Sequence, residues 1–241
     1  MKTSTYLFIA LAALTLAGCR EGYDPDVRVD GNYHSFIGGF VTPDRSTITS
    51  PCIIDVDEAA KVISYKANSF GGWENCGFSL SLDGDDRLNY GNDQAEYKTK
   101  LRDLGDTNYS GPTFTDNYAL ECSINKINVT CDDDYNAGHT AGSPANDLFE
   151  IIYQDMYAYV KNGYKPTMGS YQFDNGFPNL TKAKLNEANL GTKPYLNSKF
   201  YFRLLEVPSS EALFHYFTFD LFLSNGKTVR FKYLLLSLPT I

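Results

Sequence analysis

The acidic stretch in the middle of the chain, "CDDDYNAGHTAGSPANDLF", has the residue types that best fit metal chemistry. Asp132, Asp134 and Asn136 alternate along it as oxygen ligands alternate in a calcium loop. The pattern departs from the EF-hand, because Ala137 replaces the glycine of the sharp turn and Ser143 replaces the bidentate glutamate. The favoured interpretation is a solvated loop whose side chains bond to their own backbone, with a calcium site as the alternative.

Acid–base or nucleophilic catalysis would need a histidine or a pair of carboxylates in a suitable setting. His215 alternates on the same face as Phe217, which favours a half-buried strand residue, and His139 lies in a glycine-rich loop, which favours a polar turn. No Gly-x-Ser-x-Gly motif frames a serine. The chain has 29 acidic residues, too many for spacing to select a catalytic pair. We therefore expect no enzymatic activity and, apart from the calcium alternative, no cofactor.

The segment "NSFGGWENCGF" contains the single tryptophan of the chain and a nearby phenylalanine. Phe70 and Trp73 could form a ligand platform, because sugars stack their apolar faces on aromatic rings. The favoured alternative is a buried Trp73 that packs beside a disulfide at Cys76.

Residues 1–18 are typical of a targeting segment. Lys2 supplies a basic end, and "YLFIALAALTLAG" is an apolar run of signal-peptide length, too short for an ordinary membrane-spanning helix. The following "LAGC" resembles the lipobox of bacterial lipoproteins, in which the preceding segment is removed and the cysteine is acylated. That resemblance implies that acylated Cys19 anchors the protein to a membrane, because two or three acyl chains keep a protein stably bound to a bilayer. Residues 19–31 would then form a tether between the membrane and the folded domain.

Four cysteines remain in the exported part: Cys52, Cys76, Cys122 and Cys131. An even number of cysteines in an exported protein favours disulfides, for which three pairings exist. Closeness in the sequence favours Cys122–Cys131 and Cys52–Cys76, with four buried free thiols as the alternative. A zinc site is disfavoured, because the sequence has no Cys-x₂-Cys pair.

Composition and charge narrow the fold class and the partners. The chain has 18 Tyr and 16 Phe, residues that favour pleated, half-buried strands. Its net charge of −8 argues against a nucleic-acid partner, because phosphate binding requires a basic surface.

The clearest elements are three successive strands near the C-terminus, of which the last two are joined by "SNG". A three-residue loop over residues 224–226, with its glycine left-handed, would pair Phe219 with Phe231 and Asp220 with Arg230. A two-residue Asn-Gly turn, the alternative, would mix charge with aromatic side chains on one face. The first register separates the faces and pairs the charges, so we expect it.

Two segments are candidates for helices. Residues 146–162 have a polar side at helical spacing and a possible cap at Gly163, although their Tyr and Ile content also fits a strand. We expect a helix there, with a strand as the alternative, and a short second helix over 179–191. The whole pattern predicts one mostly β domain over 32–241, an antiparallel β-sandwich that is immunoglobulin- or fibronectin-like, with one or two short helices.

Two stretches resemble a family of lipid-anchored lipoproteins of unknown function from Bacteroidetes. They are "INKINVTCDDDYNAGHTAGSPANDLF", with its Asp-Tyr, His-x-Ala-Gly and Asn-Asp-Leu-Phe steps, and the late "LSNGKTVRF". The resemblance covers about the second half of the chain. It implies an exported, lipid-anchored, mostly β domain, and it brings no catalytic residues.

These features together predict a lipoprotein of the cell envelope, held in the outer membrane through Cys19 and facing either the periplasm or the outside. Its expected role is non-catalytic, either binding or structural. The alternatives are an accessory glycan-binding surface lipoprotein and a pilin-like subunit of a surface fibre that joins its neighbours by strand addition.

Overall fold

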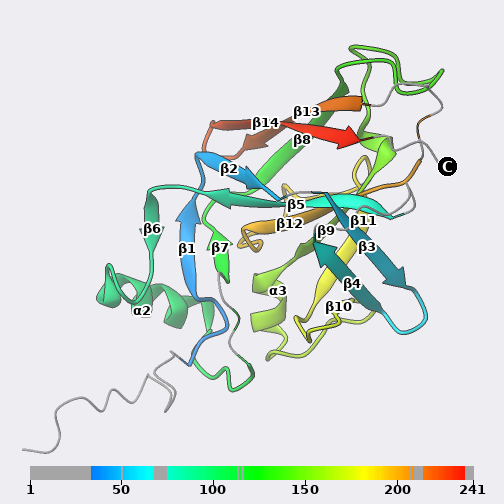
Figure 1. Ribbon diagram of the computed structural model, residues 1–241. Coiled ribbons are helices and arrows are strands. Elements are labelled where there is room, and N and C mark those ends of the chain that lie inside the picture. The colour runs from blue at the N-terminus through cyan, green and yellow to red at the C-terminus, as the bar shows by residue number, and fades with distance from the viewer. Residues whose placement is uncertain are drawn as a thin grey trace, which may run out of the picture. The chain divides into compact units, whose positions relative to one another are not determined.

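The described part of the chain consists mainly of β-strands. This computed structural model describes residues 34–49, 51–67, 75–112, 114, 117–206, 208 and 214–236. The strands form three sheets in which most neighbours are antiparallel (Figure 1). The mostly β, sandwich-like class is therefore confirmed. The predicted signal peptide and tether lie outside the described residues.

The largest sheet has eight strands and runs in the order β10-β4-β3-β5-β12-β9-β11, with β2 also paired to β5. Its strands are β2 (Arg45–Ile48), β3 (Cys52–Asp57), β4 (Val62–Ala67), β5 (Cys76–Asp83), β9 (Phe149–Gln154), β10 (Gln172–Phe173), β11 (Leu180–Lys184) and β12 (Lys199–Leu204). β10 and β4 run parallel, and eight strands exceed the number in either sheet of an immunoglobulin domain. This sandwich therefore differs from the immunoglobulin fold in the number and order of its strands.

The second sheet has three strands, β14 (Thr228–Leu236), β13 (Phe214–Leu223) and β8 (Ile124–Cys131). Its hairpin has the predicted register, with Phe219 opposite Phe231 and Asp220 opposite Arg230. The loop is the predicted three-residue one, and Gly226 within it is left-handed at φ 82°. The Arg230 Nε atom lies 2.6 Å from an oxygen of Asp220, so the predicted charge pair also forms.

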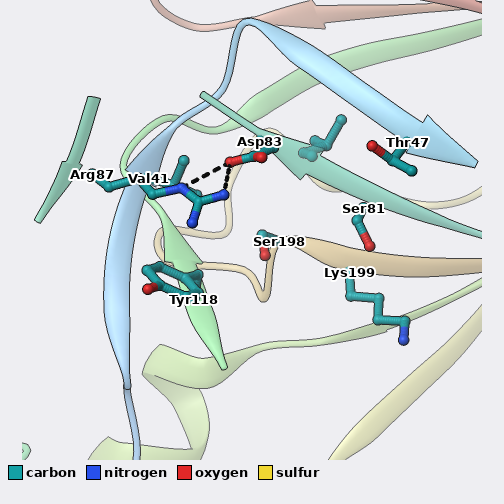
Figure 2. A pocket seen from close by; sticks show the side chains of 9 residues that line it. Val41, Thr47, Ser81, Asp83, Arg87, Tyr118, Ser198 and Lys199 are labelled. Atoms are coloured by element: carbon teal, nitrogen blue, oxygen red, sulfur yellow. Dashed lines mark hydrogen bonds and ion pairs between the residues drawn. The ribbon is translucent and has the colours of Figure 1, made fainter. Parts of the chain in front are cut away.

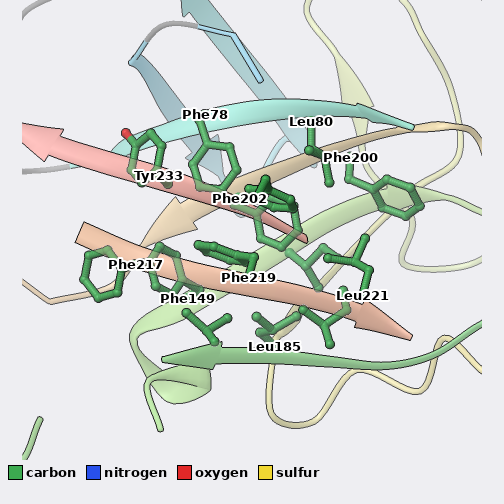
Figure 3. Packing of buried hydrophobic residues seen from close by; sticks show 14 of the residues in the cluster. Phe78, Leu80, Phe149, Leu185, Phe200, Phe202, Phe217, Phe219, Leu221 and Tyr233 are labelled. Atoms are coloured by element: carbon green, nitrogen blue, oxygen red, sulfur yellow. The ribbon is translucent and has the colours of Figure 1, made fainter. Parts of the chain in front are cut away.

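An aromatic core fills the space between these two sheets. Figure 3 shows Phe78 and Phe202 pointing from β5 and β12 toward Phe219 on β13. Phe219 is fully buried, and its ring centroid lies 4.8 Å from that of Phe231 and 5.2 Å from that of Phe149. We call this cluster the interior core.

A third sheet contains β6 (Asp86–Leu88), β1 (Gly39–Thr42) and β7 (Tyr118–Leu120), next in the chain to helix α2 (Gln94–Leu104). The sequence prediction missed α2, which buries Tyr97, Leu101 and Leu104 at helical spacing. Asp93 caps its N-terminus, and Gly105 ends it in the left-handed conformation. Those two caps were the sequence signal for this helix.

The predicted helix over 146–162 is wrong for its first half. The segment contains a short 3₁₀ turn, η1 (Asn146–Leu148), then strand β9, and only then helix α3 (Met156–Lys161). Phe149, Ile151 and Tyr153 alternate into the interior core, a period of two that a helix cannot match.

The second predicted helix, over 179–191, is also wrong. Its first part is strand β11, which pairs antiparallel with β9 so that Lys182 stands opposite Ile152. The partner strand decides this, because the segment "LTKAK" has no strong intrinsic preference of its own.

Candidate functional site

The outer face of the large sheet, opposite to the interior core, carries a small cavity with aromatic walls, which we call the aromatic cavity. Its volume is about 170 Å³. Four of its lining residues are aromatic and three are amides, and the full lining is Phe114, Gln154, Phe173, Asn175, Phe177, Leu180, Asn197, Lys199 and Tyr201. Sites for drug-sized ligands measure about 300–1,000 Å³, so this cavity suits a single small ring.

Strand alternation places the first wall of the aromatic cavity. Phe200 and Phe202 of β12 enter the interior core, so Tyr201 between them faces the opposite side of the sheet. The Phe173 ring stands edge-on to Tyr201 at 4.7 Å between centroids. A turn with left-handed Gly176 then brings Phe177 beside Phe173.

The second wall combines Phe177 with Phe114, whose ring centroids lie 4.8 Å apart in an edge-to-face arrangement. Phe114 also lines an adjoining hollow of about 470 Å³ that contains Tyr109, Tyr159 and Tyr164. The ring of Phe114 thus borders both hollows, and a ligand longer than one ring can extend past it from the aromatic cavity toward the tyrosines.

Buried amides form a fixed polar floor. The Nδ2 atom of Asn197 donates to Oδ1 of Asn117 at 2.8 Å and to Oε1 of Gln154 at 3.2 Å, and all three residues are buried. Gln154 in turn donates to the carbonyl of Pro178 at 2.7 Å. These bonds hold the floor in one arrangement before any ligand arrives, which lowers the entropy cost of binding. At the rim, no described residue accepts a bond from Nδ2 of Asn175, so that amide can donate to a ligand.

A second cavity, of about 260 Å³, shares Lys199 with the aromatic cavity, and we call it the polar cavity. Figure 2 shows Arg87 bonded to Asp83, with the ring of Tyr118 close to the guanidinium group. The distance from the guanidinium carbon to the ring centroid is 5.3 Å. Hydroxyl groups of Thr47, Ser81 and Ser198 also line it, and Lys199 lines both cavities.

A network of ion pairs covers another part of the same sheet face. Glu150 is buried and lies 3.0 Å from the Lys182 ammonium and 2.8 Å from the Arg203 guanidinium. Lys182 also contacts Glu58 at 2.7 Å. Hydrogen bonds from Lys182 and Tyr171 lower the pKa of Glu58 to about 2. Glu58 is thus ionised at neutral pH, and the ammonium groups of Lys61 and Lys182 hold its carboxylate.

The side chains of the candidate calcium loop are engaged by protein groups. Asp132 lies 2.7 Å from the ammonium of Lys232, and Asp134 accepts from the backbone of Ala141 at 2.8 Å. Asn136 accepts from the backbone of Gly138 and His139, both at 2.9 Å. The favoured interpretation, a loop bonded to its own backbone, is confirmed for Asp134 and Asn136. No cluster of three metal-ligating side chains occurs among the described residues.

The two internal histidines occupy structural positions. His139 bonds to Asn136 through Nδ1 at 2.8 Å and to Asp147 through Nε2 at 3.1 Å, which confirms the polar turn role. His215 lies 3.2 Å from Asp133 and is fully buried rather than half-buried.

The two predicted disulfides are wrong, because Cys52, Cys76, Cys122 and Cys131 are free thiols. Strand β8 runs from Ile124 to Cys131, and at about 3.3 Å per residue it places Ile124 roughly 23 Å from Cys131. Cys122 is only two residues before Ile124, so it cannot reach Cys131. Cys52 stands opposite Gly77, whereas Cys76 stands opposite Ile53, so Cys52 and Cys76 point to opposite faces of the sheet. Neither pair meets the geometry of a disulfide.

The reactivity of the four thiols toward an alkylating reagent tests whether they are free. Burial raises the pKa of Cys52 to about 12 and that of Cys131 to about 11, so little reactive thiolate exists at pH 8. We expect peptide mapping after alkylation in denaturant, without reductant, to find all four cysteines labelled. In the native protein Cys52 and Cys131 should label slowest. A disulfide would be revealed if labelling in denaturant required prior reduction.

Three predicted site residues, Cys19, Phe70 and Trp73, lie outside the described residues. The residues of the aromatic cavity were missed by the sequence prediction. A signal was present, because "QFDNGFPN" puts two phenylalanines on either side of an Asn-Gly turn. The other lining residues Phe114, Asn197 and Tyr201 come from segments far away in the sequence. Only the folding of the sheet brings them to the same cavity.

Comparison of the chain with protein-family models, curated proteins and solved structures finds no match. Among the residues that the structure describes, none of the helices has the length and apolar character needed to cross a bilayer. The function is therefore inferred from the geometry of the site.

Proposed function

We propose that this chain is a non-catalytic carbohydrate-binding lipoprotein of the cell envelope, anchored through Cys19. The observation that carries the proposal is the aromatic cavity, in which four rings surround a rigid amide floor. A sugar ring offers apolar C–H faces to aromatic rings and hydroxyl groups to amides. The aromatic walls and the amide floor can therefore both contact a bound sugar. The adjoining tyrosine-lined hollow favours an oligosaccharide.

A surface-fibre subunit is less well supported. Strand addition would use an open sheet edge, and β14 is an edge strand of nine residues within the described chain. Arg230 and Lys232 project from that strand and are largely exposed. Charged side chains on an edge discourage pairing with another strand.

The test uses the full-length lipoprotein in a detergent without a sugar headgroup, screened against an oligosaccharide array and then measured by titration calorimetry. For an oligosaccharide that binds, Phe177→Ala should raise the dissociation constant about tenfold, since a lost aromatic contact costs about 1 kcal/mol or more. Phe177 forms the wall without lying in the interior core.

The matched control is Phe214→Ala, which removes a half-exposed ring from β13 and should leave affinity unchanged. Binding by no oligosaccharide of a broad array would refute the proposal. An equal loss in both variants would move the binding site away from the aromatic cavity.

A further inference from the structure

Lys199 stands at the junction of the two cavities. It is the first residue of β12, and it lines the aromatic cavity and the polar cavity together. Asn197, which precedes it by two residues, faces only the aromatic cavity, and Ser198 faces only the polar one. Lys199 is the residue that the two linings share, so a ligand that reaches from one cavity toward the other passes beside its side chain.

The charge of Lys199 is not neutralised within the described residues, where no carboxylate lies within 4.0 Å of its ammonium group. The ammonium group lies over the ring of Tyr201, at 5.6 Å from the centroid. Other partly buried lysines differ, since Lys182 contacts two glutamates and Lys193 lies 3.1 Å from Asp155. Among the described residues, Lys199 is therefore a partly buried cation without a carboxylate partner, in a chain of net charge −8.

The rest of the polar cavity does not cancel this charge. Asp83 is the acidic side chain of its lining, and Arg87 already pairs with it through Nε at 3.0 Å. Arg45 approaches the other oxygen of Asp83 at 3.7 Å. The hydroxyl groups of Ser81 and Ser198 add hydrogen-bond donors beside Lys199. An anionic group entering here meets a net positive site.

We propose that the oligosaccharide bound by this protein is acidic and that Lys199 holds its anionic group, a carboxylate or a sulfate, at the junction of the two cavities. This inference rests on the proposed function and specifies its ligand class. Sugar rings occupy the aromatic cavity, and the acidic substituent points toward the hydroxyl groups of the polar cavity. A charge-assisted hydrogen bond of this kind strengthens binding and gives it dependence on salt.

The test compares matched probes on the full-length protein by titration calorimetry. The probes are a tetramer of galacturonic acid, its methyl ester, and a sulfated and a desulfated form of one neutral oligosaccharide. The acidic form of a pair should bind about tenfold more tightly than its neutral counterpart, and this preference should weaken as salt rises. A preference within the galacturonic acid pair indicates that the anionic group is a carboxylate, whereas a preference within the sulfated pair indicates a sulfate.

Lys199→Gln should remove the preference for the acidic form, so that the acidic and neutral members of a pair bind with dissociation constants within about twofold of each other. Lys227→Gln, which removes an exposed charge outside the linings of both cavities, is the matched control and should keep the preference. An unchanged preference in Lys199→Gln, or equal binding of acidic and neutral probes, overturns the inference. If the neutral probes still bind and remain sensitive to Phe177→Ala, the proposed function survives that failure; if no probe binds, both fail.

Discussion

Replacing Phe219 with alanine is expected to lower the free energy of unfolding by about 3–5 kcal/mol, the range measured for large-to-small changes in packed cores. Phe219 is fully buried on the middle strand of its sheet, between β8 and β14. Its ring contacts those of Phe78 and Phe202 on the opposite sheet at 5.5 and 5.4 Å between centroids (Figure 3). The cavity left behind cannot close easily, because rigid rings surround it from both sheets.

The measurement is chemical denaturation of the wild type and the variant under the same conditions. Phe214→Ala on the same strand is the control, and it should change the free energy by about 0.5 kcal/mol or less, because that side chain is half-exposed. Similar losses in the two variants would contradict the sandwich packing of β13 against the large sheet.

Replacing Glu150 with alanine is expected to cost about 3 kcal/mol of unfolding free energy, although the lost side chain belongs to no apolar cluster. The variant leaves the cations of Lys182 and Arg203 in place, and these side chains are only 15% and 17% exposed. Lys182 keeps its contact with Glu58, but Arg203 loses the carboxylate that it approaches at 2.8 Å. An uncompensated buried charge costs more than the original pair contributed.

The control for Glu150 is Asp220→Ala, which breaks an ion pair of similar geometry at the surface. Arg230 is 69% exposed there, so water replaces the lost partner and the expected cost is about 1 kcal/mol or less. Unfolding curves of the two variants should therefore separate clearly. A triple variant, Glu150→Leu with Lys182→Met and Arg203→Met, should recover most of the loss, because it removes the three largely buried charges together and leaves Glu58, which is 58% exposed, beside Lys61 at 3.3 Å. Equal effects of the two single changes would show that the network is solvated.

One strand connects the stability of the fold with the proposed site. Along β12 the even-numbered residues enter the interior core, whereas Lys199, Tyr201 and Arg203 face the opposite side. There Lys199 and Tyr201 line the aromatic cavity, and Arg203 joins the ion-pair network. The core side of the strand thus fixes the position of the ligand side, which keeps the cavity formed without a ligand.

Local patterns in the sequence were sufficient where the structure is itself local. The register of the β13–β14 hairpin followed from the three-residue loop and from the need to segregate Phe219 and Phe231 from Asp220 and Arg230. The high Tyr and Phe content also indicated the mostly β class. The same kind of argument failed for β9 and β11, because a segment of mixed preference takes the structure of the strands that it pairs with.

By itself, the sequence determined the mostly β class, the register of the last hairpin and the bonding of Asp134 and Asn136 to their own loop, since each depends on residues close together in the chain. Only the tertiary structure decided that the four thiols stay apart, because strand direction and pleat set which face each cysteine occupies. It alone also brought Phe114, Phe177, Asn197 and Tyr201 around one cavity, with Lys199 at its edge. Their sequence separations carry no signal of that proximity, which arises when distant strands pair to bury the aromatic core on the other face of the sheet.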